Sequence, residues 1–183
     1  MQAIVITGTP GTGKSRLAKL LKQKLKHAEL VAVNEFAIKH KLVMGKDEFG
    51  ASIINTKKLA KLLNELVRRS KQTIILEGHL LCDMKIKNAK VIVLREHLKT
   101  LKRRMEQRGY EKRKIYDNLV AEATDYCGTE ASKRYKQVGE FLSSDPKLLE
   151  KVLQFIKQGK KEEDIDLLDE LLSLMKQERN FSL

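Results

Sequence analysis

Residues 8–15 read Gly-Thr-Pro-Gly-Thr-Gly-Lys-Ser, and this stretch decides the fold. It fits the pattern G-x-x-x-x-G-K-[ST] and directly follows the apolar run at residues 3–6. Glycines let successive N–H groups of such a loop point at phosphate oxygens, and the following helix N-terminus adds a positive dipole. The stretch therefore predicts a strand, a phosphate-binding loop and a helix start. Lys14 is expected to reach the β- and γ-phosphates of a nucleotide, and the Ser15 hydroxyl to bind Mg²⁺.

Apolar runs alternate with helical patterns along the rest of the chain. The helix expected after the loop has leucines at helical spacing among lysines, at Leu17, Leu20, Leu21 and Leu25. Further short apolar runs lie at Leu30–Val33, Thr73–Glu77 and Val91–Arg95, with a weaker one at Val138–Leu142. Such alternation predicts an α/β fold of three layers, in which helices cover both faces of a parallel sheet.

Charge divides the 183 residues into a basic body and an acidic tail. The chain carries a net charge of +13, whereas residues 162–183 hold seven acidic and two basic side chains, which leaves +18 on residues 1–161. We expect one kinase-like domain over residues 1–160 and an acidic helix within 161–183. A body of this charge suits a polyanionic partner, and equally a lysine-rich solvated surface, so both interpretations stay open.

The sequence disfavours a membrane protein and a protein stabilised by disulfides. Only two residues precede the first strand, and no apolar stretch approaches the ~20 residues of a membrane span, so a cytoplasmic protein without a membrane segment is expected. Cys82 and Cys127 lack C-x-x-C spacing, which indicates neither a disulfide framework nor a zinc site.

An acid and a histidine end the run Thr73–Glu77. Glu77 is the acid that a strand beside the phosphate loop offers to Mg²⁺. His79 follows two residues later, so strand alternation would place it on the same side, where it could act on the phosphate or serve only the structure.

A basic cluster predicts a lid. Arg104 and Arg108 lie four residues apart, so on a helix both could face the same phosphates, and Gly109 would end that helix as a hinge. A solvated basic helix end is the alternative. The guanine-reading pattern [NT]-K-x-D is missing, which disfavours a GTPase and favours a small phosphotransferase.

Five motifs in order resemble one family. They are GTPGTGKS, VNEFA at Val33–Ala37, EGH at Glu77–His79, VIVLR at Val91–Arg95, and RGY…KI…DN…AE from Arg108 to Glu122. Over residues 1–140 the chain is similar to the adenylate kinase-like ATPases of ribosome biogenesis. The resemblance implies a nucleoside monophosphate kinase-like P-loop fold, ATP with Mg²⁺, and transfer to AMP or a related monophosphate. It also implies an ATPase activity and association with a small-subunit ribosomal protein and rRNA.

The resemblance also implies site residues. Arg108 matches the family's lid arginine, the lid spans about residues 107–117, and the monophosphate-binding segment about residues 32–55. The family's ATP loop matches Gly11, Thr12, Gly13, Lys14, Ser15 and Arg16. Three positions depart from the family. Glu77 stands in place of aspartate, Ile38 in place of a monophosphate-binding arginine, and Asn55 near an expected acid.

Three activities are compatible with this sequence. One is an adenylate kinase with an ATPase activity in ribosome assembly, another an assembly ATPase with negligible kinase turnover, and a third a small-metabolite kinase. The tail helix, expected from Asp164 to Lys176, either competes with RNA for the basic body or packs permanently on it. Its expected apolar stripe comprises Ile165, Leu168, Leu171, Leu172 and Met175.

Overall fold

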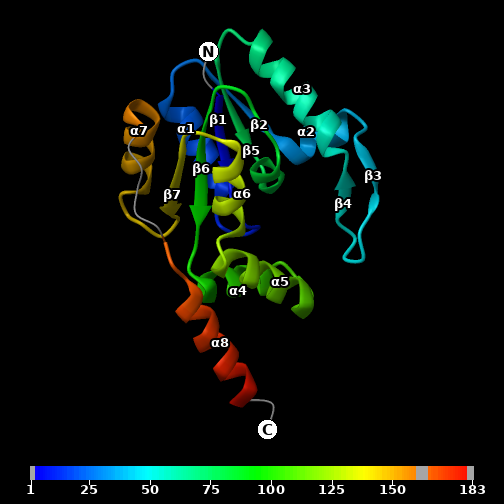
Figure 1. Ribbon diagram of the computed structural model, residues 1–183, viewed down its shortest axis with the longest axis vertical. Coiled ribbons are helices and arrows are strands. Elements are labelled where there is room, and N and C mark those ends of the chain that lie inside the picture. The colour runs from blue at the N-terminus through cyan, green and yellow to red at the C-terminus, as the bar shows by residue number, and fades with distance from the viewer. Residues whose placement is uncertain (1–2, 160–164, 181–183) are drawn as a thin grey trace.

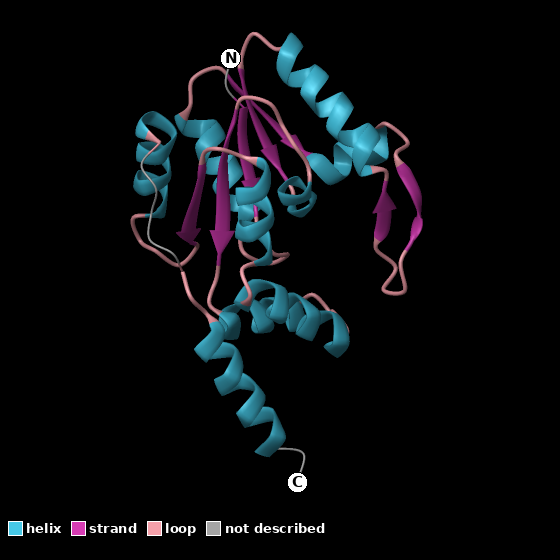
Figure 2. Cartoon of the chain, viewed as in Figure 1, coloured by secondary structure: helices cyan, strands magenta, loops and turns pink. Residues whose placement is uncertain are grey.

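The computed structural model describes residues 3–159 and 165–180, and within them five parallel strands form one sheet (Figures 1 and 2). The strand order is β2-β5-β1-β6-β7. Their bounds are β1 Ala3–Thr7, β2 Ala28–Ala32, β5 Thr73–Glu77, β6 Ala89–Arg95 and β7 Val138–Leu142. All five predicted runs are strands, although β2 starts earlier than expected and Val33 already belongs to the next helix. The central position of β1 places the phosphate-binding loop at the middle of the sheet edge.

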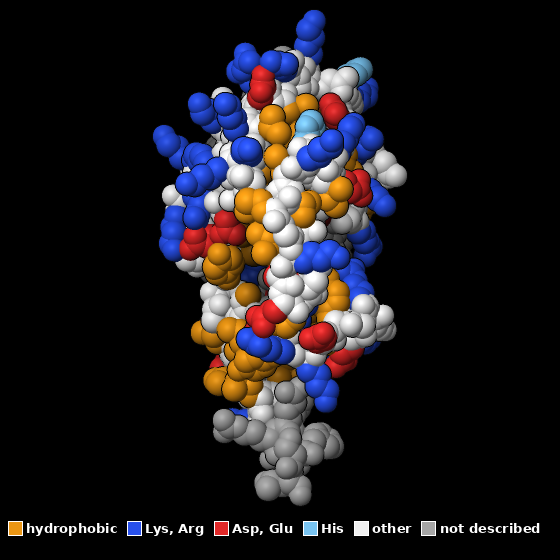
Figure 3. Space-filling view, turned by 90° about the vertical axis from the view of Figure 1, so that its right-hand side faces the viewer, with side chains coloured by type: hydrophobic (Ala, Val, Ile, Leu, Met, Phe, Trp, Pro, Cys, Tyr) orange, Lys and Arg blue, Asp and Glu red, His pale blue; other side chains and the backbone are white. Residues whose placement is uncertain are grey.

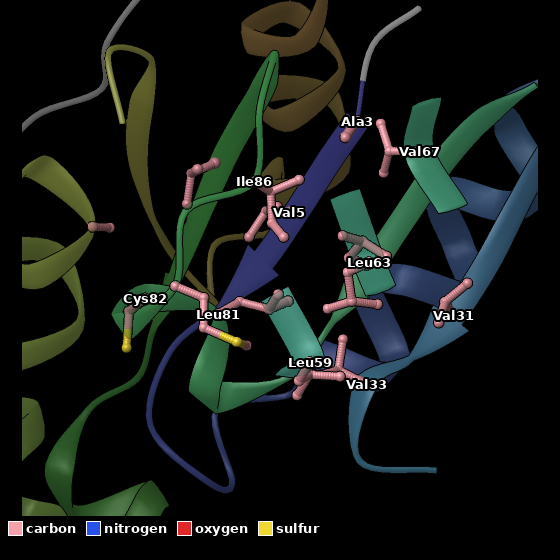
Figure 4. Packing of buried hydrophobic residues seen from close by; sticks show 14 of the residues in the cluster. Ala3, Val5, Val31, Val33, Leu59, Leu63, Val67, Leu81, Cys82 and Ile86 are labelled. Carbon is pink, nitrogen blue, oxygen red and sulfur yellow. The ribbon is translucent and has the colours of Figure 1, made fainter. Parts of the chain in front are cut away.

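Helices cover both faces of the sheet, as the alternating pattern predicts. Ile4 and Ile6 of β1 face the helices α1 (Lys14–Lys24) and α7 (Leu148–Gln158). Ala3 and Val5 face the opposite layer, made by α3 (Thr56–Arg69) and α6 (Tyr126–Arg134). Figure 4 shows Ala3 and Val5 beside Leu59, Leu63 and Val67, which form the buried stripe of α3. Each fully buried leucine in these layers stabilises the fold by roughly 1.5–3 kcal/mol.

A two-stranded hairpin projects from the side of the main sheet (Figure 2). It comprises β3 (Val43–Lys46) and β4 (Ser52–Ile54), and it follows α2 (Val33–Lys39). In its turn the Asp47 carboxylate accepts hydrogen bonds from the Phe49 and Ala51 N–H groups, at 2.9 and 2.8 Å. Asn55 then caps α3 by accepting from the Lys58 N–H at 3.0 Å. The segment expected to bind a monophosphate is thus one helix and one hairpin.

A third group of buried apolar residues, separate from those on the two faces of the sheet, lies beyond the loop edge. It forms where α4 (Leu98–Gln107), α5 (Lys112–Ala123) and α8 (Leu168–Asn180) meet (Figure 1). Leu167 and Leu174 are buried there, whereas Leu168 and Leu172 are 47% and 54% exposed. The predicted stripe is therefore wrong for the two exposed leucines, because α8 packs through a neighbouring face. The expected helix runs from Asp164 to Lys176; Asp164 lies outside the described residues, residues 165–167 are not helical, and α8 instead begins at Leu168 and continues past Lys176 to Asn180.

The start of α4 is closed by a side chain of α8. The Glu170 carboxylate accepts from the Leu98 N–H at 2.9 Å and lies 2.6 Å from Nδ1 of His97. A carboxylate at a helix N-terminus pairs with otherwise unbonded N–H groups and with the helix dipole. Thus α8 is attached to α4 by a polar contact as well as by apolar packing.

The two cysteines, far apart in sequence, are neighbours in the fold. Cys82 and Cys127 are buried free thiols whose sulfur atoms lie 3.7 Å apart. The described residues contain no group of three or more His, Cys, Asp or Glu side chains placed to hold a metal ion. Nor does any helix among them have the length and apolar character needed to cross a membrane.

Candidate nucleotide site

The phosphate-binding loop has positive φ angles at its three glycines, a conformation that residues with side chains disfavour. Gly8 has φ +137°, and a Cβ there would lie 2.3 Å from the Leu94 carbonyl oxygen of β6. Gly13 has φ +99° and is the N-cap of α1. A side chain at Gly8 would collide with backbone, and one at Gly13 would be strained by the left-handed conformation. The loop is therefore held against the sheet edge with its N–H groups grouped at the start of α1.

Lys14 is the buried cation of this loop. Its Nζ donates to the carbonyl oxygens of Gly8 and Thr9, both at 2.9 Å, and the residue is only 7% exposed. Burial lowers the pKa of Lys14, and the negative charge of Glu77 opposes that change. The ammonium is bonded to neutral carbonyl groups of the loop, so a phosphate would provide it with a charged partner.

A cleft of about 550 Å³ opens beside the loop. It is lined from four directions: by the loop itself, by α2, by the end of β5 and by the residues after α4. The cleft brings together eight of the predicted site residues, namely Gly11, Gly13, Lys14, Ser15, Arg16, Glu77, His79 and Arg108. Thr12 lies outside its lining and is fully buried, where its hydroxyl donates to the Thr9 carbonyl at 2.9 Å.

Glu77 and His79 reach the cleft by different local structures. Glu77 ends β5 beside Ile6 of β1, whereas His79 opens the short 3-10 helix η1 (His79–Asp83). The expected strand alternation therefore does not extend to His79, although both side chains line the same cleft. The backbone oxygen of His79 accepts from Thr7 Oγ1 and from Cys82 Sγ, both at 3.1 Å, which holds the turn in place.

Burial, together with the positive charge of Lys14, lowers the pKa of His79 to about 4. The imidazole is therefore neutral at pH 7, with one ring nitrogen donating and the other accepting. A neutral ring can orient a hydroxyl or a water without adding charge to the site.

Ser15 and Glu77 offer oxygen donors on the same cleft. Mg²⁺ binds in kinases through one or two protein oxygens, substrate phosphates and retained waters. A hydroxyl and a carboxylate next to a phosphate-binding loop fit that donor set. A fuller protein cage is not needed, in keeping with the lack of a three-residue metal cluster among the described residues.

Arg108 and Gly109 end α4 in a compact motif. The Gly109 N–H donates to the Glu106 carbonyl at 2.9 Å, and the Tyr110 N–H donates to the Met105 carbonyl at 3.1 Å. Gly109 has φ +70°, the left-handed value expected for this paired pattern at a helix C-terminus. The prediction that Gly109 ends the helix is confirmed, and Arg108 is exposed on the cleft side of this end.

Arg104 has a different environment from Arg108. Its Nη1 donates to the Gly11 carbonyl at 3.0 Å and lies 2.8 Å from Oε2 of the buried Glu96. Arg104 does not line the cleft. The structure thus places Arg104 as a brace between α4 and the phosphate-binding loop, while its direct contact with phosphates stays a prediction.

A buried ionic network supports the same edge of the sheet and was missed in the sequence. Arg95, 1% exposed at the end of β6, lies 2.7 Å from both Asp125 Oδ1 and Glu140 Oε2. Its Nε is 3.2 Å from Glu122 Oε1, which also accepts from the Glu96 N–H at 2.9 Å. Burial raises the pKa of Glu122, and Arg95 opposes that change. The only sequence signal is an arginine that ends an apolar strand.

Comparisons with known proteins agree with this geometry. The family model described as AAA domain matches residues 4–125. A Methanocaldococcus jannaschii protein named "Putative adenylate kinase" is 31% identical over 163 residues, covering 88% of this chain and 90% of that protein. A Methanosarcina barkeri protein of the same name is 33% identical over 171 residues, covering 87% of this chain and 90% of that protein.

Among solved structures, a sugar kinase from Janibacter sp. HTCC2649 matches with a TM-score of 0.62 and 14% identity, covering 86% of this chain and 95% of that one. At this identity the likeness shows the fold alone, and that fold is the P-loop kinase fold. The family model, which matches residues 4–125, spans the loop and every residue that lines the cleft. The chain therefore belongs to the AAA domain family of P-loop proteins and, within it, groups with the archaeal proteins named putative adenylate kinase.

Proposed function

We propose that this protein is a Mg-ATP-dependent adenylate kinase, which converts ATP and AMP to two ADP, with other nucleoside monophosphates as further acceptors. The observation that carries the proposal is the single cleft in which Lys14 and Ser15 of the loop face Glu77, His79 and Arg108. The names of the archaeal relatives support the same reaction.

The loop binds the ATP phosphates, and the acceptor enters from the α2 side. Lys14 would leave its bonds to the loop carbonyls and pair with the β- and γ-phosphates, while Arg108 would approach the γ-phosphate from the end of α4. Ser15 and Glu77 would hold Mg²⁺, which neutralises phosphate charge when bound.

In the transfer step an oxygen of the AMP phosphate attacks the γ-phosphorus, and the bond from that phosphorus to the β–γ bridging oxygen breaks. Lys14 and Arg108 spread the charge that develops on the transferring group. Neutral His79 would orient the attacking oxygen by a hydrogen bond. A water held in the same place gives ATP hydrolysis, so both activities share one cleft.

On the acceptor side the chain departs from the family at Ile38, where the resemblance implies a monophosphate-binding arginine. Asn34 and Glu35 of α2 line the cleft, whereas Ile38 is 59% exposed and offers no charge to a monophosphate. Acceptor recognition would therefore rest on polar groups of α2 and on cations contributed by other elements.

A coupled assay tests the proposal. Phosphate transfer from ATP is measured with AMP, CMP, dAMP or water as the acceptor. ADP formation that depends on AMP and exceeds phosphate release supports the adenylate kinase. Hydrolysis alone supports an assembly ATPase, and activity confined to a metabolite in a wider screen supports a small-metabolite kinase.

A role in small ribosomal subunit maturation is a second proposal, and the charge of the body supports it. Residues 1–161 carry +18, and Figure 3 shows Lys and Arg side chains spread over the face that bears the hairpin. Such a surface would bind an RNA-rich particle with an affinity that falls steeply as salt rises. Binding of purified small subunits at 50 and 200 mM salt tests it, since an affinity independent of salt would contradict an RNA partner.

A further inference from the structure

The start of α5 carries a run of cations where a helix normally avoids them. Its first turn contains Lys112, Arg113 and Lys114 and no acidic residue. Positive charge near a helix N-terminus opposes the helix dipole, whereas a bound anion there would be stabilised by both. Of the three side chains, Lys114 lines the nucleotide cleft. Its charge is close enough to the site to lower the pKa of His79.

Aromatic rings from two elements hold Lys114. Its Nζ lies 5.1 Å from the centre of the Tyr110 ring and 5.6 Å from the centre of the Phe49 ring. Both distances allow cation–π attraction, which orients the ammonium without neutralising its charge. Tyr110 follows Gly109 in the turn after α4, whereas Phe49 belongs to the hairpin turn at residues 47–50. Lys114 thus lies where the lid and the acceptor segment meet.

The hairpin turn contacts the lid through two links. Arg113 Nη1 lies 3.2 Å from Glu48 Oε2, but both side chains are largely exposed, so this ion pair contributes little. Phe49 is half-buried although Asp47, Glu48 and Gly50 around it are exposed, and the Arg113 guanidinium also lies 5.7 Å from its ring centre. Phe49 is therefore a partly buried contact between the hairpin and two cations of α5.

We propose that Lys114 is a further catalytic cation, which contacts the transferring phosphoryl group, and that Phe49 is the positioning residue that holds it over the cleft. This inference rests on the phosphotransfer proposed above. The Phe49 ring belongs to the hairpin of the acceptor segment. Binding of an acceptor to that segment would therefore affect the position of the Lys114 ammonium near the phosphates.

Steady-state kinetics test the catalytic part. Lys114→Ala is expected to lower kcat about 10²-fold, the usual effect of removing one donor to the developing charge, with little change in the KM for ATP. Phe49→Ala should lower kcat less, by about tenfold, and Phe49→Tyr should retain activity. In the Lys114→Ala background, Phe49→Ala should have no additional effect, because the two residues act as one unit.

Two controls match these variants. Lys112→Ala removes the same charge from the same helix turn, outside the cleft lining, and Met44→Ala removes an exposed apolar side chain from the same hairpin. Wild-type rates for Lys114→Ala, or independent multiplying effects of Lys114→Ala and Phe49→Ala, would overturn the proposal. So would equal losses in Lys114→Ala and Lys112→Ala.

A spectroscopic measurement keeps this test separate from the proposed function. The chain contains no tryptophan, so Phe49→Trp places a single tryptophan at the contact, whose emission can be excited apart from that of the tyrosines. Its emission should change when Lys114→Ala is added and stay constant when Lys112→Ala is added; an unchanged spectrum would contradict the contact.

If the wild type makes no ADP from AMP, the kinase proposal fails, and the same kcat comparison is made on phosphate release from ATP. If Lys14→Ala lowers transfer while Lys114→Ala leaves kcat at the wild-type value, only the inference about Lys114 fails.

Discussion

At the scale of single residues, the site depends on two groups whose pKa is lowered by burial, Lys14 and His79. The buried Lys14 ammonium donates two hydrogen bonds to loop carbonyls, and the His79 ring is neutral at pH 7 because it is buried beside Lys14. One residue thus offers a concentrated positive charge, and the other offers hydrogen bonding without charge. These two properties suit them to different parts of a phosphoryl transfer.

Replacing Lys14 should separate catalysis from folding. Lys14→Ala removes the cation expected at the β- and γ-phosphates, so kcat/KM should fall by 10²-fold or more, about 3 kcal/mol of transition-state stabilisation. Thermal unfolding should change little, because the lost bonds join Lys14 to carbonyls of its own loop. Lys19→Ala, on the exposed side of the same helix, is the matched control. Near-normal turnover in Lys14→Ala would contradict the assignment of the phosphate site.

His79 should make the stability of the protein depend on pH. Its pKa in the folded protein is about 4, below the 6.5 of an ordinary histidine, so the unfolded chain binds more protons between these values. Stability is therefore highest above pH 6.5 and falls as the pH drops from 6.5 towards 4, by up to ~3 kcal/mol from this group. Urea unfolding of His79→Asn across pH 4–7 should lack that contribution. Parallel pH profiles for wild type and variant would show that His79 is not the responsible group.

At the scale of elements, α4 serves the site at two different points. Arg104 reaches from within the last turn of the helix to the Gly11 carbonyl, and Leu101 Cδ1 would lie 2.8 Å from a Cβ at Gly11. Arg108 stands at its C-terminus on the cleft. The helix therefore supports the loop with one part and presents a cation with another.

Replacing Arg104 and replacing Arg108 of α4 should change different kinetic parameters. Arg104→Ala loosens the loop, so the KM for ATP should rise severalfold, and Arg108→Ala removes a cation near the transferring group, so kcat should fall more, by about tenfold or more. Initial rates at varied ATP and saturating AMP separate the two parameters. Arg103→Ala, exposed on the same helix, is the control. Identical kinetic changes in Arg104→Ala and Arg108→Ala would contradict this division.

Elements with a local signal could be predicted from the sequence, and elements set by tertiary contacts could not. The loop at residues 8–15 and the strand before it follow from glycine chemistry and apolar runs, and the structure has both. The hairpin has weak signals because β3 is exposed throughout, so no apolar alternation marks it. The contacts of Lys114, Arg95 and Glu170 join segments far apart in sequence, and charged residues of that kind look like ordinary surface lysines, arginines and glutamates. For the same reason the pattern could not separate the roles of Arg104 and Arg108.

At the scale of the whole molecule, the acidic C-terminal helix α8 packs against α4 and α5, the helices on either side of the expected lid. Leu174 of α8 and Leu167, which directly precedes the helix, are buried in this cluster, and Glu170 caps α4. A helix held in this way is not free to cover the basic body as an internal polyanion. The structure therefore supports the interpretation in which α8 packs permanently on the body.

Removing that helix should weaken the lid before it affects RNA binding. In a chain ending at Gly159, α4 and α5 lose the two buried leucines, worth roughly 1.5–3 kcal/mol each, and a helix cap worth about 1 kcal/mol. The melting temperature and the solubility should both fall, without tighter binding to rRNA.

Point variants give the matched comparison, since Leu174→Ala removes a buried contact and Leu172→Ala, 54% exposed, removes none. Leu174→Ala should lower the melting temperature by several degrees while Leu172→Ala leaves it within a degree or two. Tighter rRNA binding by the shortened chain, at an unchanged melting temperature, would instead establish the tail as a competitor for the basic surface.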